Sequence, residues 1–194
     1  MIEKIALNIV TQMEEKGLIG NSDKKFYEYA LITLIERVVT VGSILIIGEC
    51  YKRLLFISLF LLFFFFLRER TGGYHAEKFW HCYFMTNMTC IIVIKMADIL
   101  AENLIFTYVI LVISAILILG IGAVNHPNIA MNKKELKQTK SVARKNVMLE
   151  MIVIVMISGL NISKLYVSYL SMSIILCAFL LCTQLSQLIF PNKA

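Results

Sequence analysis

The chain has 194 residues, of which 59% are hydrophobic and only 16% are charged, and its mean hydropathy is +0.77. A soluble domain of this size must cover its surface with polar side chains, so the composition excludes an ordinary soluble globule and predicts an integral membrane protein. The length predicts one domain, residues 1–194. A net charge of +6 would suggest nucleic acid in a soluble protein. In a membrane protein basic residues set topology instead, so we expect no nucleic-acid partner.

The N-terminal segment, residues 1–29, predicts an amphipathic helix rather than a signal peptide. It lacks a sustained apolar core ending in small residues. Apolar residues recur at spacings of three and four, namely Ile2, Ile5, Ile9 and Met13. Such a helix lies at the membrane surface or against the bundle, and a short soluble helix is the alternative.

Six apolar runs follow this segment and predict an all-α, polytopic membrane helix bundle. The clearest run, 104–124, has 21 residues and no charge. It would reach about 31 Å, which matches a hydrocarbon core of about 30 Å. The run 54–67 has only 14 residues, so Lys52 and Arg53 must extend their charges outward for it to cross. We expect about six spans (four to six), formed by the runs 30–48, 54–67, 83–97, 104–124, 147–162 and 165–190.

Basic residues orient these spans. Loop 125–146 carries six Lys and Arg residues against one acid, so the positive-inside rule places it in the cytoplasm. Counting back along the chain places 68–82 and both termini in the cytoplasm as well. Only Lys52 and Arg53 oppose this arrangement. The sequence therefore predicts a multi-pass protein of the cell membrane, in contact with the lipid bilayer.

Residues 68–82 interrupt the apolar runs with the sequence RERTGGYHAEKFWHC. Cys82 and His75 suggest thiol catalysis, in which a thiolate attacks a carbonyl and an imidazole handles the proton. On one continuous helix these residues would lie about 10 Å apart along the axis, which is too far for a hydrogen bond. Gly72 and Gly73 permit the turn that would bring them together, and a helix beginning near Cys82 would favour the thiolate. The alternatives are an interfacial histidine and a simple turn.

The same segment does not have the pattern of a metal site. His75 and His81 are six residues apart, without the H-E-x-x-H spacing of zinc peptidases. Trp80 beside His81 is typical of an aromatic belt at the membrane interface. The five cysteines form no CxxC pair. We therefore expect no metal, no other cofactor and no disulfide scaffold.

A family resemblance rests on this motif. Arg70 (or alternatively Arg68), the pair Gly72-Gly73, His75-Ala76, and a cysteine seven residues after the histidine are similar to the accessory gene regulator B (AgrB) family. These are membrane peptidases of quorum sensing in Gram-positive bacteria. The resemblance extends over most of the chain, through its length, its spans and a later basic loop containing Pro127. That loop lacks the further prolines that many relatives have.

The resemblance implies a specific chemistry. It implies that Cys82 forms a thioester with an AgrD-type precursor peptide, and that His75 acts as the base. A Cys or Ser of the peptide then closes a thiolactone or lactone ring, which gives an autoinducing peptide. It also implies a homodimer. Basic residues would attract the acidic part of the precursor, although a solvated positive-inside loop is the alternative for most of them: Arg68, Lys133, Lys134 and Lys137.

A non-enzymatic class competes with this interpretation. Charged residues in or near the apolar runs often mark transport pathways, although they also pair at helix ends. They suggest a membrane transporter or scaffold, including one that exports a peptide. The residues in question are Glu36, Arg37, Lys95 and Glu150.

Overall fold

The computed structural model describes residues 2–20, 23–71, 79–124, 132–160 and 162–189. Over these ranges all regular structure is helical, which confirms the all-α prediction. The helices are α1 (Ile2–Glu15), α2 (Lys24–Cys50), α3 (Leu54–Thr71), α4 (Phe79–Glu102), α5 (Leu104–Ile121), α6 (Lys133–Gly159) and α7 (Lys164–Ile189).

Four of these helices are long and apolar enough to cross a membrane: α2, α5, most of α4 (Trp80–Glu102) and most of α7 (Lys164–Ser186). The apolar part of α3 is followed by Arg68, Glu69 and Arg70, and α6 begins with a basic stretch, so neither helix is apolar throughout. Each predicted run nevertheless corresponds to one helix, in the predicted order. The structure therefore agrees with the expected four to six spans.

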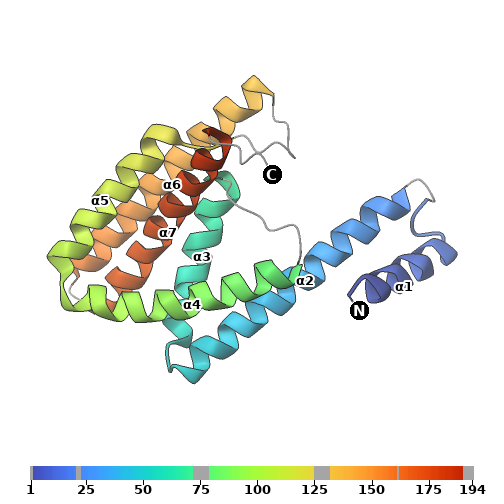
Figure 1. Cartoon of the computed structure of the whole chain (residues 1–194), viewed down its shortest axis with the longest axis horizontal. Helices are drawn as coiled ribbons and strands as arrows, with labels where there is room; N and C mark the ends of the chain where they lie inside the picture. Colours follow the sequence, from blue (N-terminus) through green and yellow to red (C-terminus); the bar gives the residue numbers. More distant parts are fainter. Residues whose placement is uncertain (1, 21–22, 72–78, 125–131, 161, 190–194) are drawn as a thin grey trace.

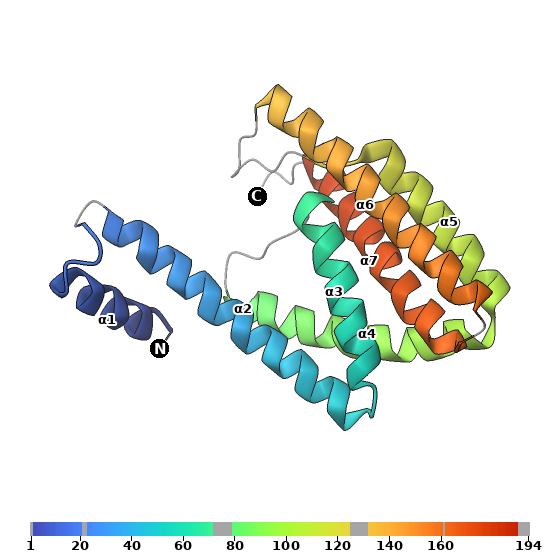
Figure 2. The same cartoon turned by 180° about the vertical axis from the view of Figure 1, so that it is seen from behind.

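Helices α3, α5, α6 and α7 lie side by side, whereas α2 and α4 cross at one end of this group (Figures 1 and 2). Helix α7 packs against α3, α5, α4 and α6. Helix α1 packs on α2, away from the other helices. At one end of the group α3, α5 and α7 end and α6 begins. We call this the basic end, because it carries Arg68, Arg70 and the basic first turns of α6.

The core is organised around α7. Every residue of α7 from Val167 to Ile174 is buried, because neighbouring helices cover α7 on several sides. One apolar cluster joins α7 to α3, α5 and α6, and a second joins it to α2, α3 and α4. Truncating a fully buried leucine or isoleucine such as Ile118 or Ile154 costs about 2–5 kcal/mol in well-packed proteins. The two clusters therefore fix α3 firmly against α7.

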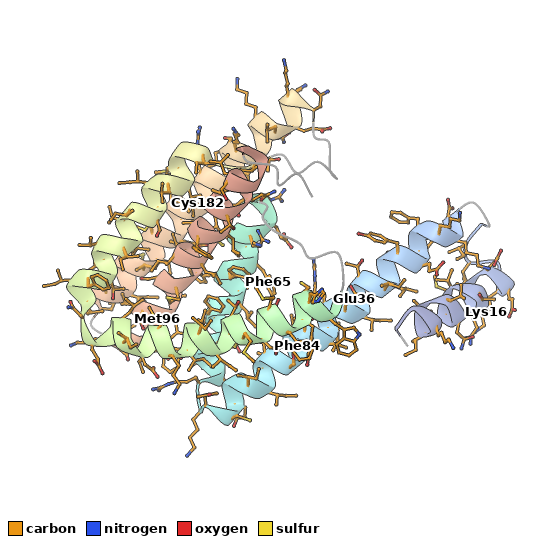
Figure 3. All side chains as sticks on the ribbon, in the orientation of Figure 1. Lys16, Glu36, Phe65, Phe84, Met96 and Cys182 are labelled. Carbon is orange, nitrogen blue, oxygen red and sulfur yellow. The ribbon has the colours of Figure 1, made fainter. Side chains whose placement is uncertain are left out.

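Large apolar side chains also cover the outer faces of the helices. Phe65, Phe84 and Met96 are exposed and project from α3 and α4 (Figure 3). Exposed apolar surface on this scale is typical of a protein that lipid surrounds. It supports membrane localisation.

Helix α1 is amphipathic, as predicted, and small residues make its buried contact with α2. Ala6 and Val10 are fully buried, whereas Ile5 and Ile9 are exposed. An ion pair between Lys24 Nζ and Glu14 Oε2, at 2.6 Å, links the start of α2 to α1. Helix α1 therefore lies against α2 on its small residues and leaves larger apolar residues outside.

The predicted loop 125–146 differs from the structure, because residues 133–146 form the first turns of α6. Glu135 accepts a hydrogen bond from the backbone N–H of Asn132 at 2.9 Å, which satisfies a free donor at the helix start. Helix α5 ends at Ile121, earlier than predicted, because Gly122 has a φ of +76°. Arg144 adds a cap there, donating to Leu119 O at 2.8 Å and Gly120 O at 3.2 Å.

The basic residues that opposed the predicted orientation lie at the other end of the helix group. Arg53 pairs with Asp98 of α4, with 3.2 Å between Nη2 and Oδ1. Lys52 has a φ of +54° in the tight connection between α2 and α3. The carboxylate of Asp98 thus neutralises the charge of Arg53, one of the two basic residues that oppose the predicted membrane orientation.

Candidate active site

The motif divides between two helices. Arg68, Arg70 and Thr71 belong to the last turn of α3, and Cys82 lies in the first turn of α4. Gly72, Gly73 and His75 lie outside the described residues, as does Glu77. The pairing of His75 with Cys82 therefore stays a prediction.

Cys82 is placed where a helix favours an anion. Its side chain is half-buried near the N-terminus of α4, where the helix dipole and free N–H groups stabilise negative charge. Thr86 follows one turn later. Its hydroxyl donates to Cys82 O at 2.7 Å and lies 4.0 Å from the Cys82 sulfur. This position meets the expectation that a helix starts close to the cysteine.

The two arginines of the motif differ in environment. Arg70 is exposed, whereas Arg68 is half-buried. Burial lowers the pKa of the Arg68 guanidinium below its ordinary value, while the neighbouring Cys177 and Cys82 act in the opposite direction. Arg68, on α3, is therefore a cation close enough to Cys82, on α4, to interact with it electrostatically. The spacing of the motif favours Arg70, whereas the electrostatic interaction with Cys82 involves Arg68.

Three contacts anchor the end of α3 that carries Arg68. The Asn146 side-chain amide of α6 donates to Phe66 O at 3.0 Å. The backbone N–H of Val124 donates to the O of Thr71, a fully buried residue, at 3.4 Å. The Cys177 thiol of α7 lies 3.8 Å from the carbonyl oxygen of Phe64. These anchors were not predictable from the sequence, because they depend on which helices become neighbours.

Comparison with known proteins identifies the family of this chain. The family model described as accessory gene regulator B matches residues 2–185. The chain belongs to the AgrB family. A search of the curated proteins and a search of the solved structures found no match. The AgrB family takes part in accessory gene regulator quorum sensing, which gives the motif a biological setting.

The other polar residues near the motif of this AgrB protein face outward. Trp80 and His81 are exposed on the first turn of α4, and the Trp80 ring packs edge-on against Tyr83 at 6.0 Å. Glu69 is exposed on α3.

Within the described ranges no group of three His, Cys, Asp or Glu residues lies close enough to hold a metal ion. Lys133, Lys134 and Lys137 are exposed on the first turns of α6.

The charged residues that suggested transport lie on three different helices. Glu36 is half-buried and Arg37 is exposed on α2. Lys95 is exposed on α4, with its Nζ 5.3 Å from the centre of the Tyr51 ring. Glu150 is the exception, because it is 1% exposed on α6 and both its carboxyl oxygens lack a hydrogen-bond partner among the described residues.

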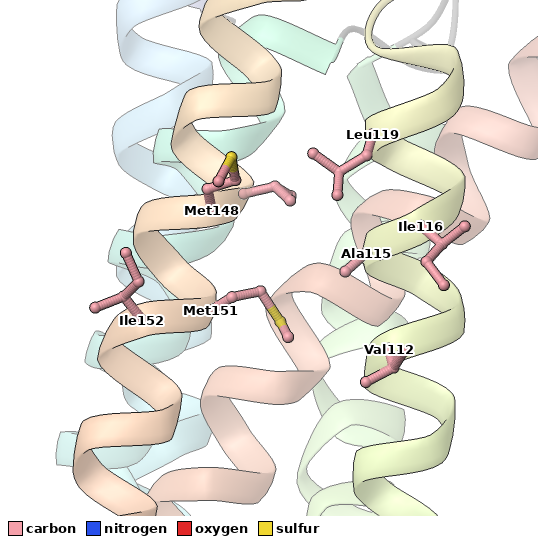
Figure 4. A pocket seen from close by; sticks show the side chains of 8 residues that line it. Val112, Ala115, Ile116, Leu119, Met148, Met151 and Ile152 are labelled. Atoms are coloured by element: carbon pink, nitrogen blue, oxygen red, sulfur yellow. The ribbon is translucent and has the colours of Figure 1, made fainter.

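Two hollows occur away from the motif. The larger, of about 350 Å³, lies between α5 and α6 and has only apolar lining residues (Figure 4). The smaller, of about 300 Å³, lies at the end opposite the basic end, near Ser158 and Lys164. Neither includes a described residue of the motif, so neither is a candidate for the reaction site.

Proposed function

We propose that this AgrB protein is a membrane cysteine endopeptidase that cleaves an AgrD-type precursor peptide and promotes its cyclisation. The observation that carries the proposal is Cys82 in the first turn of α4, within electrostatic reach of the Arg68 cation. A cysteine attacks a carbonyl as its thiolate, and both features place positive charge or the positive end of a helix dipole beside the sulfur. The family match over residues 2–185 supplies the setting in autoinducer processing.

The proposed reaction has two acyl transfers. The Cys82 thiolate attacks a carbonyl carbon near the C-terminal side of the precursor, and the C–N bond breaks as His75 delivers a proton to the leaving amine. The product is a thioester between Cys82 and the N-terminal part of the precursor. A Cys or Ser side chain of the same peptide then attacks the thioester carbonyl, and His75, now neutral, takes the proton of that thiol or hydroxyl. The ring closes as a thiolactone or lactone, and the Cys82 thiolate is released.

The proposed surroundings favour cyclisation over hydrolysis. A thioester keeps much of its activation, so ring closure is an exchange of one acyl bond for another. Water competes for the thioester, and a site beside the lipid phase restricts its access. We infer that the basic end faces the cytoplasm, where a newly made precursor reaches it. The exposed Arg70 and the basic turns of α6 would attract the acidic part of that precursor.

Co-expression with a precursor tests the enzyme proposal. Cys82→Ala and His75→Ala should each leave the precursor uncut, measured by mass spectrometry of cell extracts. Cys182→Ala, at an equally half-buried cysteine, and His81→Ala, at the other motif histidine, are matched controls that should retain processing. Normal processing in either of the first two variants would favour a transporter or scaffold.

Thiol labelling tests the proposed activation separately. Cys90 and Cys177 are buried, so slow labelling there reports burial alone. The useful comparison is with Cys182, which is half-buried like Cys82. At neutral pH Cys82 should react faster with iodoacetamide, as followed by peptide mass spectrometry.

The arginine pair gives the sharper version of this experiment. Arg68→Gln should slow labelling of Cys82 by about fivefold, corresponding to roughly 1 kcal/mol of charge interaction. Arg70→Gln removes the same charge two residues away from an exposed position, and should change the rate little. Equal effects of the two variants would contradict the role given to Arg68.

The homodimer stays a prediction, which sedimentation of the detergent-solubilised protein tests.

A further inference from the structure

The groove between α5 and α6 has the shape and chemistry of a slot for one hydrocarbon chain. Its floor is made by Ala115 and Val147, which are 4% and 0% exposed. Its rims are made by Met148 and Ile152 on α6 and Ile116 on α5, all more than half exposed (Figure 4). The groove therefore opens on the outer surface of the helix group, where lipid is the surrounding medium.

The groove is short and entirely apolar. Its lining residues on α5 run from 112 to 119, which spans about 10 Å along the helix axis. Its volume is about 350 Å³, and no polar side chain lines it. A single acyl chain is thin and apolar, so it suits this slot.

One end of the groove is strongly basic. Arg144 precedes the rim residue Met148 by one helical turn, and its guanidinium donates to the carbonyl oxygens of Leu119 and Gly120. Leu119 itself lines the groove, so the cation lies at the mouth of the slot. Those two bonds use two of five N–H donors, which leaves the others for an anion. Lys145, also exposed, is the next residue of α6.

We propose that this groove binds one anionic phospholipid, with an acyl chain between α5 and α6 and the headgroup phosphate on Arg144 and Lys145. An apolar slot that ends in two cations matches an amphiphile with a negatively charged head. The basic end of the groove coincides with the basic end of the helix group, where the membrane surface is expected. Anionic headgroups are attracted by basic residues at that level, by about fivefold in affinity for each residue.

Native mass spectrometry of the full-length protein tests the site. The protein in neutral detergent is mixed with equal amounts of phosphatidylglycerol and phosphatidylcholine that carry the same acyl chains. We expect one phosphatidylglycerol to be retained, at least about fivefold in preference to phosphatidylcholine. Lys145→Gln should reduce this retention by about fivefold, whereas Lys164→Gln, a matched loss of charge at the opposite end, should not.

Further variants separate the headgroup from the chain slot. Arg144→Gln should weaken retention of phosphatidylglycerol, and Arg144→Lys should restore most of it. Met148→Trp, on the exposed rim, and Ala115→Leu, on the floor, should reduce retention of both lipids by filling the slot. Equal retention of the two lipids, or no effect of Lys145→Gln, would overturn the proposal. So would a protein dimer that both filling variants disrupt, because a second copy would then occupy the groove.

Discussion

Replacing Glu150 with leucine should stabilise the protein. The carboxyl is 1% exposed, and neither of its oxygens has a hydrogen-bond partner among the described residues. Ser173 lies beside it, but the Ser173 hydroxyl donates to Leu170 O at 2.6 Å. A buried polar group without a partner costs about 1–3 kcal/mol, which an apolar side chain of similar size does not incur. Glu150→Leu should therefore raise Tm by about 2–12 °C for a chain of this length.

Thermal unfolding of the purified protein in detergent, followed by far-ultraviolet circular dichroism, measures this effect. Glu150→Gln keeps two buried polar groups and should gain much less than Glu150→Leu. Glu102→Leu, at an exposed acid in the last turn of α4, should change stability by less than about 0.5 kcal/mol. A lower Tm for Glu150→Leu would refute the reasoning, since it would mean that the carboxyl makes a stabilising interaction inside the bundle.

Two further predictions concern helix ends and use the same melting assay. Gly122→Ala should destabilise by at least about 1–2 kcal/mol, because Gly122 has a φ of +76° and an added Cβ would lie 3.0 Å from Lys140 Cβ. Gly120→Ala, with no atom within 4 Å of the added Cβ, should be neutral or stabilising, and a loss equal to that at Gly122 would contradict this. Asn146→Leu should cost about 1 kcal/mol through the lost bond to Phe66 O and should slow labelling of the motif thiol. An unchanged labelling rate would show that the anchor does not position the motif.

The spans were predictable because the physics that defines them is local. A run such as 104–124 needs only its own length and lack of charge to be recognised as a membrane helix. Helix ends depended on finer detail. The many lysines of residues 133–146 predict a polar loop, although these residues are helical. The start of α6 is encoded locally, by the cap that Asn132 and Glu135 form.

The candidate site was predictable only in part. The motif singled out Cys82 and His75, and spacing required a break in the helix before the cysteine. Which arginine interacts electrostatically with the cysteine depends on how α3 rotates against α7, and local sequence does not encode this. Asn146 was also missed for this reason, since its partner lies 80 residues away in the chain.

The end of α4 that carries Cys82 is packed less tightly than the rest of the helix. Between Trp80 and Thr86 no residue is buried, and burial begins only at Asn87. Farther along, α4 is fixed by α7, α2 and the Arg53–Asp98 ion pair. Only the first turns of α4 therefore lie outside the core. From Asn87 back to Cys82 this part of the helix is about 8 Å long, so a tilt of about 5° at Asn87 moves the sulfur by about 0.7 Å. Substitutions that loosen the packing at Asn87 or Cys90 can therefore change the position of the Cys82 thiol.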